Sequence, residues 1–161
     1  MKFVPSTVLI AALVLPAAPA ELFPQGKPDF SGSWTMDRSR SESAMQNEPI
    51  GPVTVVIAQT LGEVRIETTR TPGSSVVTYK LDGSEVTIPG GTAKTHWDGT
   101  MLVTEAVRNI QGQTVTTKET RRLNPDGSEM TVETMLVVQH GYSLRGTPNY
   151  GAGKDVYVRS R

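Results

Sequence analysis

The segment Pro28-Asp29-Phe30-Ser31-Gly32-Ser33-Trp34-Thr35-Met36-Asp37 decides the fold class. Its bulky residues Phe30, Trp34 and Met36 share one parity, and the polar residues at 31, 33, 35 and 37 share the other. Alternation with a period of two is typical of a strand that buries one face. The segment therefore predicts the first strand of an all-β domain, with Trp34 on the buried face.

The residues before this segment have the organisation of an export signal. Lys2 is followed by the apolar run Val8–Leu15, and Ala18-Pro19-Ala20 supplies a small-x-small cleavage pattern before Glu21. The apolar run is too short to span a bilayer, and no later run approaches that length. We expect residues 1–20 to be a cleaved signal peptide, 21–29 an extended arm and 30–161 a single β-barrel domain that is periplasmic or secreted.

Composition narrows the classes of partner. The sequence contains no cysteine, which excludes disulfides, cysteine-ligated metals and the acylated residue of a lipoprotein. Cleavage after residue 20 removes Lys2 from the 16 basic residues and none of the 16 acidic residues. The mature chain would therefore be close to neutral, and it would have no strong positive potential to attract nucleic acid or an anionic membrane. We therefore expect no nucleic-acid partner, no membrane span and no lipid anchor.

Strand patterns follow one another at short intervals, and no segment of helix length shows a 3.6-residue period. The predicted strands are Val53–Gln59, Gly62–Arg70, Ser75–Leu81, Glu85–Ile88, Thr92–Trp97, Met101–Asn109, Gln113–Leu123, Ser128–Val138 and Asp155–Ser160. Two long connectors, Asp37 to Pro52 and Gln139 to Gly153, could each be a lid over the barrel mouth or an ordinary flexible loop.

Asp-Gly turns predict how these strands connect. Asp82-Gly83, Asp98-Gly99 and Asp126-Gly127 each lie between two strand patterns. Both residue types tolerate the positive φ of a hairpin turn, so consecutive strands should pair as an antiparallel meander. Closure of the meander would remove its two edges. The sequence therefore predicts an up-and-down barrel of eight to ten strands, and a two-sheet β-sandwich is the alternative architecture.

Several of these residues resemble a known family. Gly32-Ser33-Trp34 resembles the Gly-x-Trp motif of lipocalins, and Arg159 stands where lipocalins place an arginine over that tryptophan. The chain also resembles small exported lipocalin-like (calycin-type) bacterial proteins in several short segments. These are Pro28–Trp34, Trp97–Gly99, Leu102-Val103, Leu123–Gly127 and Val156-Tyr157.

The resemblance implies a barrel closed by Trp34 beneath Arg159 and a cup that binds a small apolar or amphipathic molecule. Arg121 departs from the family pattern, which has a large aromatic residue at this position. A purely apolar cup is therefore in doubt.

Strand parity also places charged residues inside the barrel. On Gln113–Leu123 the only parity with apolar residues includes Glu119 and Arg121, which would lie about 7 Å apart on one face. On Met101–Asn109 two registers remain open, one that turns Glu105 inward and one that turns Arg108 inward. Because buried charges require partners or water, the cup should be partly polar.

We infer a set of candidate ligand-binding residues from this parity. The set is Tyr79, Trp97, Glu105, Arg108, Glu119 and Arg121. The forked guanidinium of Arg121 would suit a carboxylate or another polar group. The alternative is a structural ion pair of Arg121 with Glu119 near a barrel rim, and Tyr79 and Trp97 could equally belong to the core.

Motifs for catalysis and for cofactors are lacking. The sequence contains two histidines, His96 on an outward parity and His140 in a loop, and this arrangement does not predict a metal site. It contains no Gly-x-Ser-x-Gly elbow, and Gly151–Asp155 lacks the spacing of a phosphate loop. We expect no cofactor and a small-molecule binder. The alternatives are a cofactor-free enzyme that uses Glu119 and Arg121, and a barrel filled by its own side chains.

Overall fold

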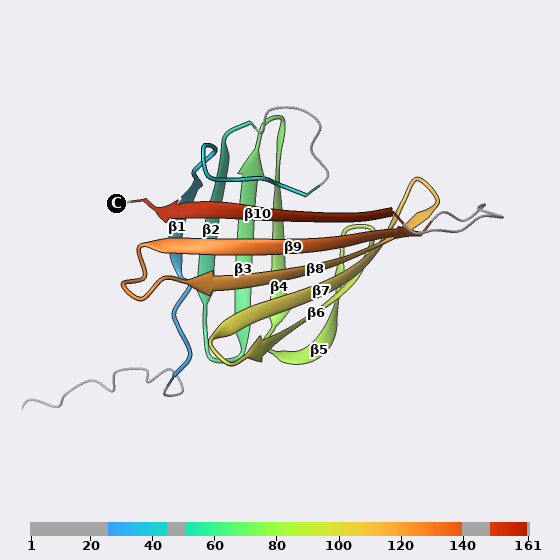
Figure 1. Ribbon diagram of the computed structural model, residues 1–161. Coiled ribbons are helices and arrows are strands. Elements are labelled where there is room, and N and C mark those ends of the chain that lie inside the picture. Colours follow the sequence, from blue (N-terminus) through green and yellow to red (C-terminus); the bar gives the residue numbers. More distant parts are fainter. Residues whose placement is uncertain (1–25, 45–50, 140–148, 161) are drawn as a thin grey trace, which may run out of the picture.

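The protein folds into one antiparallel sheet of ten strands that curls into a nearly closed barrel (Figure 1). A computed structural model describes residues 26–44, 51–139 and 149–160. The predicted signal peptide, residues 1–20, lies outside the described residues, as do the first residues of the predicted arm. The strands are β1 Gly32–Met36, β2 Val53–Gln59, β3 Glu63–Arg70, β4 Gly73–Lys80, β5 Asp82–Ile88, β6 Gly91–Asp98, β7 Met101–Ile110, β8 Gln113–Leu123, β9 Glu129–Gln139 and β10 Asn149–Arg159.

The strand order confirms the predicted up-and-down topology. In the sheet the strands follow the order β4-β3-β2-β1-β10-β9-β8-β7-β6-β5. The first strand pairs with the last, at Trp34 with Arg159 and at Met36 with Tyr157. This pairing joins the β1–β4 meander to the β5–β10 meander. β4 and β5 form the two ends of the order, and no hydrogen-bonded ladder connects them.

One predicted hairpin is wrong. Asp98-Gly99 and Asp126-Gly127 lie between paired strands, but the strands on either side of Asp82-Gly83 do not pair. Gly83 has a φ of 82°, and the pairing of β5 with β6 shifts register between Asp82 and Glu85. The positive φ of Gly83 therefore coincides with an irregularity in the pairing of β5 with β6 and not with a hairpin between β4 and β5.

The late connector is also shorter than the sequence predicted. The last strand begins at Asn149, so 149–153 belongs to β10 and pairs with β9. Gly151 and Gly153 hid this strand because glycine has low β-propensity. The rest of this connector, 140–148, which could be a lid or an ordinary loop, lies outside the described residues.

Trp34 is the centre of the core at one end of the barrel. Phe30 and Trp34 are completely buried, and the Trp34 indole donates a hydrogen bond of 3.0 Å to the Phe30 carbonyl oxygen. The Arg159 guanidinium carbon lies 4.2 Å from the centroid of the Trp34 ring. At Gly32, where φ is 134°, an added Cβ would lie 2.5 Å from Arg159 Nη1. Glycine at 32 therefore gives Arg159 room to cover the tryptophan.

We predict that Trp34→Ala lowers the free energy of unfolding by about 3–5 kcal/mol, because it removes a fully buried ring from the junction of β1 and β10. Tyr150→Ala is the matched aromatic control, since Tyr150 is 76% exposed on β10. Its cost should stay within about 0.5 kcal/mol. Urea unfolding followed by circular dichroism measures both values. Similar losses in the two variants would contradict the assignment of Trp34 as the core of this junction.

Candidate ligand-binding site

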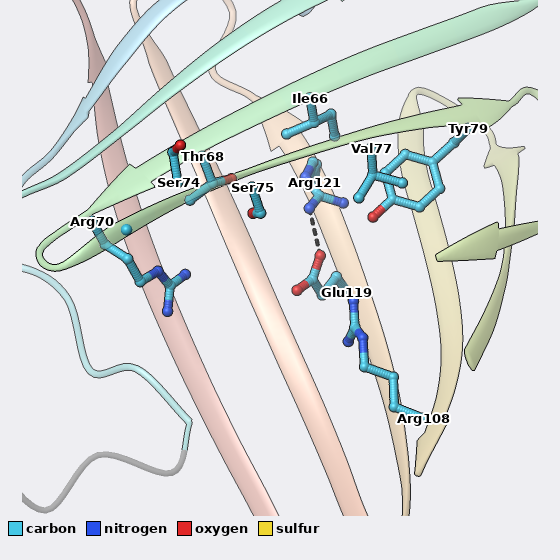
Figure 2. A pocket seen from close by; sticks show the side chains of 11 residues that line it. Ile66, Thr68, Arg70, Ser74, Ser75, Val77, Tyr79, Arg108, Glu119 and Arg121 are labelled. Atoms are coloured by element: carbon cyan, nitrogen blue, oxygen red, sulfur yellow. Dashed lines mark hydrogen bonds and ion pairs between the residues drawn. The ribbon is translucent and has the colours of Figure 1, made fainter. Parts of the chain in front are cut away.

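A cavity of about 470 Å³ lies inside the barrel, bounded by β3 and β4 on one side and by β7 and β8 on the other (Figure 2). Its lining consists of Ile66, Thr68, Arg70, Gly73, Ser74, Ser75, Val77, Tyr79, Arg108, Glu119 and Arg121. Arg70 ends β3, whereas Phe30 bonds to Gln59 beside the start of β3. The cavity therefore extends toward the end of the barrel opposite Phe30.

Glu119 and Arg121 form an ion pair in the cavity wall. Arg121 is 8% exposed, and its Nη2 donates to Glu119 Oε2. Its Nη1 donates a hydrogen bond of 3.3 Å to Thr104 Oγ1, and Thr104 is hydrogen-bonded in turn to Thr95. A charge this well buried requires such partners. Glu119 therefore neutralises most of the charge of Arg121 inside the protein.

The pairing of β7 with β8 decides which of the two open registers is present. Leu102 pairs with Arg121 and Arg108 pairs with Val115, so Leu102, Ala106 and Arg108 face the interior. Glu105 lies on the outer face, with its carboxylate 3.9 Å from Lys118 Nζ. The register that would turn Glu105 into the barrel is therefore wrong, and Glu105 does not line this cavity. Both faces of β7 carry apolar residues, so the sequence of this strand does not show which face is inward. The pairing of β7 with β8 is needed to decide.

Arg70 lines the cavity but is absent from the set of ligand-binding residues predicted from the sequence. It shares its parity with Val64, Ile66 and Thr68, which are inward-facing residues of β3. The alternation of residues along β3 therefore indicates, from the sequence alone, that Arg70 faces the interior. Neither Arg70 nor Arg108 forms an ion pair or a hydrogen bond with another residue in the described part of the chain. The cavity therefore contains three guanidinium groups and one carboxylate.

The two predicted aromatic residues occupy different places. Tyr79 lines the cavity, and burial raises the pKa of its phenol, so that it remains a neutral hydrogen-bonding group. Trp97 does not line the cavity. It packs against Phe30, with ring centroids 6.0 Å apart, and Lys27 Nζ lies 5.3 Å from its ring centroid. Trp97 thus belongs, with Trp34 and Arg159, to the opposite end.

A backbone segment after β1 crosses the inner face of β10. Glu42 forms a bridge with Lys154, and a Cβ added to Gly153 would lie 2.0 Å from the Ala44 nitrogen. Ser43 Oγ donates a hydrogen bond to Asp155, and burial raises the pKa of that carboxyl group. This segment begins the connector that the sequence marked as a candidate lid, of which residues 45–50 lie outside the described part.

The described residues contain no group of three side chains able to hold a metal ion. They also contain no helix with the length and hydropathy to cross a membrane.

These features define an up-and-down β-barrel of ten antiparallel strands with an internal cavity. The structure is similar to that of a fatty acid transporter, REP1-NXSQ, with a TM-score of 0.57 and 12% sequence identity over 82% of this chain and 96% of that chain. It is also similar to the wild-type fluorescent protein UnaG, with a TM-score of 0.54 and 17% identity over 81% of this chain and 97% of that chain. No family model and no curated protein matches the sequence.

We predict that Glu119→Gln lowers the free energy of unfolding by about 1–3 kcal/mol, because Arg121 would stay buried without a counter-charge. Glu105→Gln is the matched control on the outer face, where the loss of a solvent-exposed pair should cost less than about 0.5 kcal/mol. Thermal and urea unfolding would measure both. If Glu119→Gln lowers the free energy of unfolding no more than Glu105→Gln does, the ion pair of Glu119 with Arg121 does not stabilise the fold.

The raised pKa of Asp155 predicts how the stability of the protein changes with pH. Because its pKa is raised in the folded state, that state holds the Asp155 proton more tightly than the unfolded state does. Its contribution to stability is therefore complete below the ordinary pKa of 3.8 and is lost as the pH rises through the raised pKa. The stability of Asp155→Asn relative to the wild type should consequently increase from about pH 4 to about pH 7.

Asp126 provides the control of opposite sign. A hydrogen bond from Ser128 lowers the pKa of Asp126, so its contribution is present above 3.8 and is lost on acidification. The stability of Asp126→Asn relative to the wild type should therefore stay nearly constant from about pH 4 to about pH 7 and should rise only as the pH falls below 3.8. Urea unfolding at a series of pH values gives both trends, and parallel trends for the two variants would refute the assignment.

Proposed function

We propose that the barrel binds a small amphipathic molecule with an acidic group in the cavity between β3, β4, β7 and β8. The observation that carries the proposal is the charge of the lining, which among the described residues contains the guanidinium groups of Arg70, Arg108 and Arg121 and one carboxylate, that of Glu119. A guanidinium group presents donors that match the geometry of a carboxylate. The uncompensated positive charge favours an anion over a neutral ligand.

The remaining lining residues support an amphipathic ligand. Ile66, Val77 and Tyr79 form an apolar side of the cavity, whereas Thr68, Ser74 and Ser75 add hydroxyl groups near Arg70 (Figure 2). A volume of about 470 Å³ lies within the range of small-molecule sites. An apolar body with an acidic end would match both sides of the cavity.

The similarity to a fatty acid transporter supports the same class of ligand, since one barrel of similar fold is named for carrying an apolar chain with a carboxylate. The proposed role is transport or sequestration of such a molecule. We also propose that the protein is exported, because residues 1–20 have the pattern of a signal peptide. Binding would then take place in the periplasm or outside the cell.

We predict that decanoate binds the protein and that Val77→Trp weakens this binding at least about tenfold, because an indole would fill the apolar side of the cavity. Val76→Trp is the matched control, since Val76 lies on the outer face of β4 and is 48% exposed. Isothermal titration calorimetry measures both affinities, with circular dichroism as the check on folding. An equal effect of the two tryptophans, or no binding to the wild type, would contradict the proposal.

A further inference from the structure

We propose that the natural ligand carries two negative charges and that Arg70 and Arg108, rather than Arg121, bind them. This inference rests on the proposed function, because it specifies the ligand of the same cavity. Two chemistries would satisfy it, namely a molecule with two separate carboxylates and a molecule with one doubly charged group such as a phosphate monoester. The three guanidinium groups differ in whether the protein already supplies them with a partner.

Arg121 is already occupied by protein groups. Its Nη2 is bound to Glu119 and its Nη1 to Thr104. A ligand anion at Arg121 would also meet the carboxylate of Glu119, which is the acidic group of the cavity lining in the described part of the chain. Like charges at close range in a partly buried site are unfavourable. Arg121 is therefore a positioning residue that holds Glu119.

Arg70 and Arg108 have no such partners among the described residues, and they come from different walls of the barrel. Arg70 ends β3, and Thr68 and Ser75 are its neighbours on the inward faces of β3 and β4. Arg108 lies near the end of β7, opposite Val115 of β8. In the view of Figure 2 the Glu119–Arg121 pair lies between them. Two cationic groups are thus available for a ligand.

Two carboxylates partly offset this charge. Glu119 is paired with Arg121, and its side chain is 34% exposed. Asp155 lies outside the cavity lining, accepts a hydrogen bond from Ser43 and is close enough to Arg70 for the two charges to interact. The carboxylate of Asp155 is already hydrogen-bonded to Ser43, and among the described residues it forms no ion pair with Arg70. The excess of positive charge therefore remains at Arg70 and Arg108.

The test compares three probes with one alkyl length by isothermal titration calorimetry at low ionic strength, namely decanoate, decanedioate and decyl phosphate. At least one dianion should bind the wild type about tenfold more tightly than decanoate, the amount expected for one added charge-assisted hydrogen bond. Arg70→Gln and Arg108→Gln should each remove most of this advantage. Arg122→Gln should retain it, because Arg122 lies on the outer face of β8, 3.6 Å from Glu133.

The outcomes separate this inference from the proposed function. If decanoate and both dianions bind the wild type with similar affinity, the proposed function stands and the dianion inference is wrong. If no probe binds, the proposed function fails. A preference for decanedioate would indicate that the two arginines bind separate acids, and a preference for decyl phosphate would indicate that they bind one group. Arg70→Lys and Arg108→Lys should retain part of the advantage, which a merely structural role would not explain.

Discussion

The pairing of β1 with β10 holds the two halves of the barrel together. No ladder joins β4 to β5, so within the described residues the two meanders are connected by hydrogen-bonded strands only through the contact of the first strand with the last. Trp34 and Arg159 are direct partners in that register, and the guanidinium group covers the ring. Cation–π contacts are worth about 0.5–2 kcal/mol, whereas burial of the tryptophan is worth more. Burial of Trp34 therefore stabilises the junction of β1 and β10 more than its contact with Arg159 does.

The missing ladder between β4 and β5 also explains why charged residues can occupy the interior. The cavity is lined from β3 and β4 and from β7 and β8, on either side of the place where the sheet is not continuous. A fully sealed barrel would make unpaired guanidinium groups prohibitively costly. Here Arg121, the most deeply buried, is paired with Glu119, and the more accessible Arg70 can be hydrated. The buried arginine thus has a partner within the protein, whereas the exposed arginine has none among the described residues.

Much of this arrangement could be predicted from strand parity. The alternation along β8 leaves one inward register, and that register includes Glu119 and Arg121. Parity could not decide between Glu105 and Arg108, because β7 is apolar on both faces and only its pairing with β8 separates them. Asp82-Gly83 misled the prediction because a glycine with positive φ suits a bulge as well as a hairpin. Arg70 shares the inward parity of Ile66 and Thr68, so the alternation along β3 was sufficient to place it in the cavity lining.

Binding of an acidic ligand by the arginine side chains inside the barrel can be observed in an NMR titration of the arginine Nε–Hε signals with decanoate. Single arginine-to-lysine substitutions assign the signals. Those of Arg70 and Arg108 should shift saturably, while those of Arg65 and Arg122 on the outer face should not move. Shifts confined to the outer arginines, or the same small drift in every arginine signal, would contradict such binding.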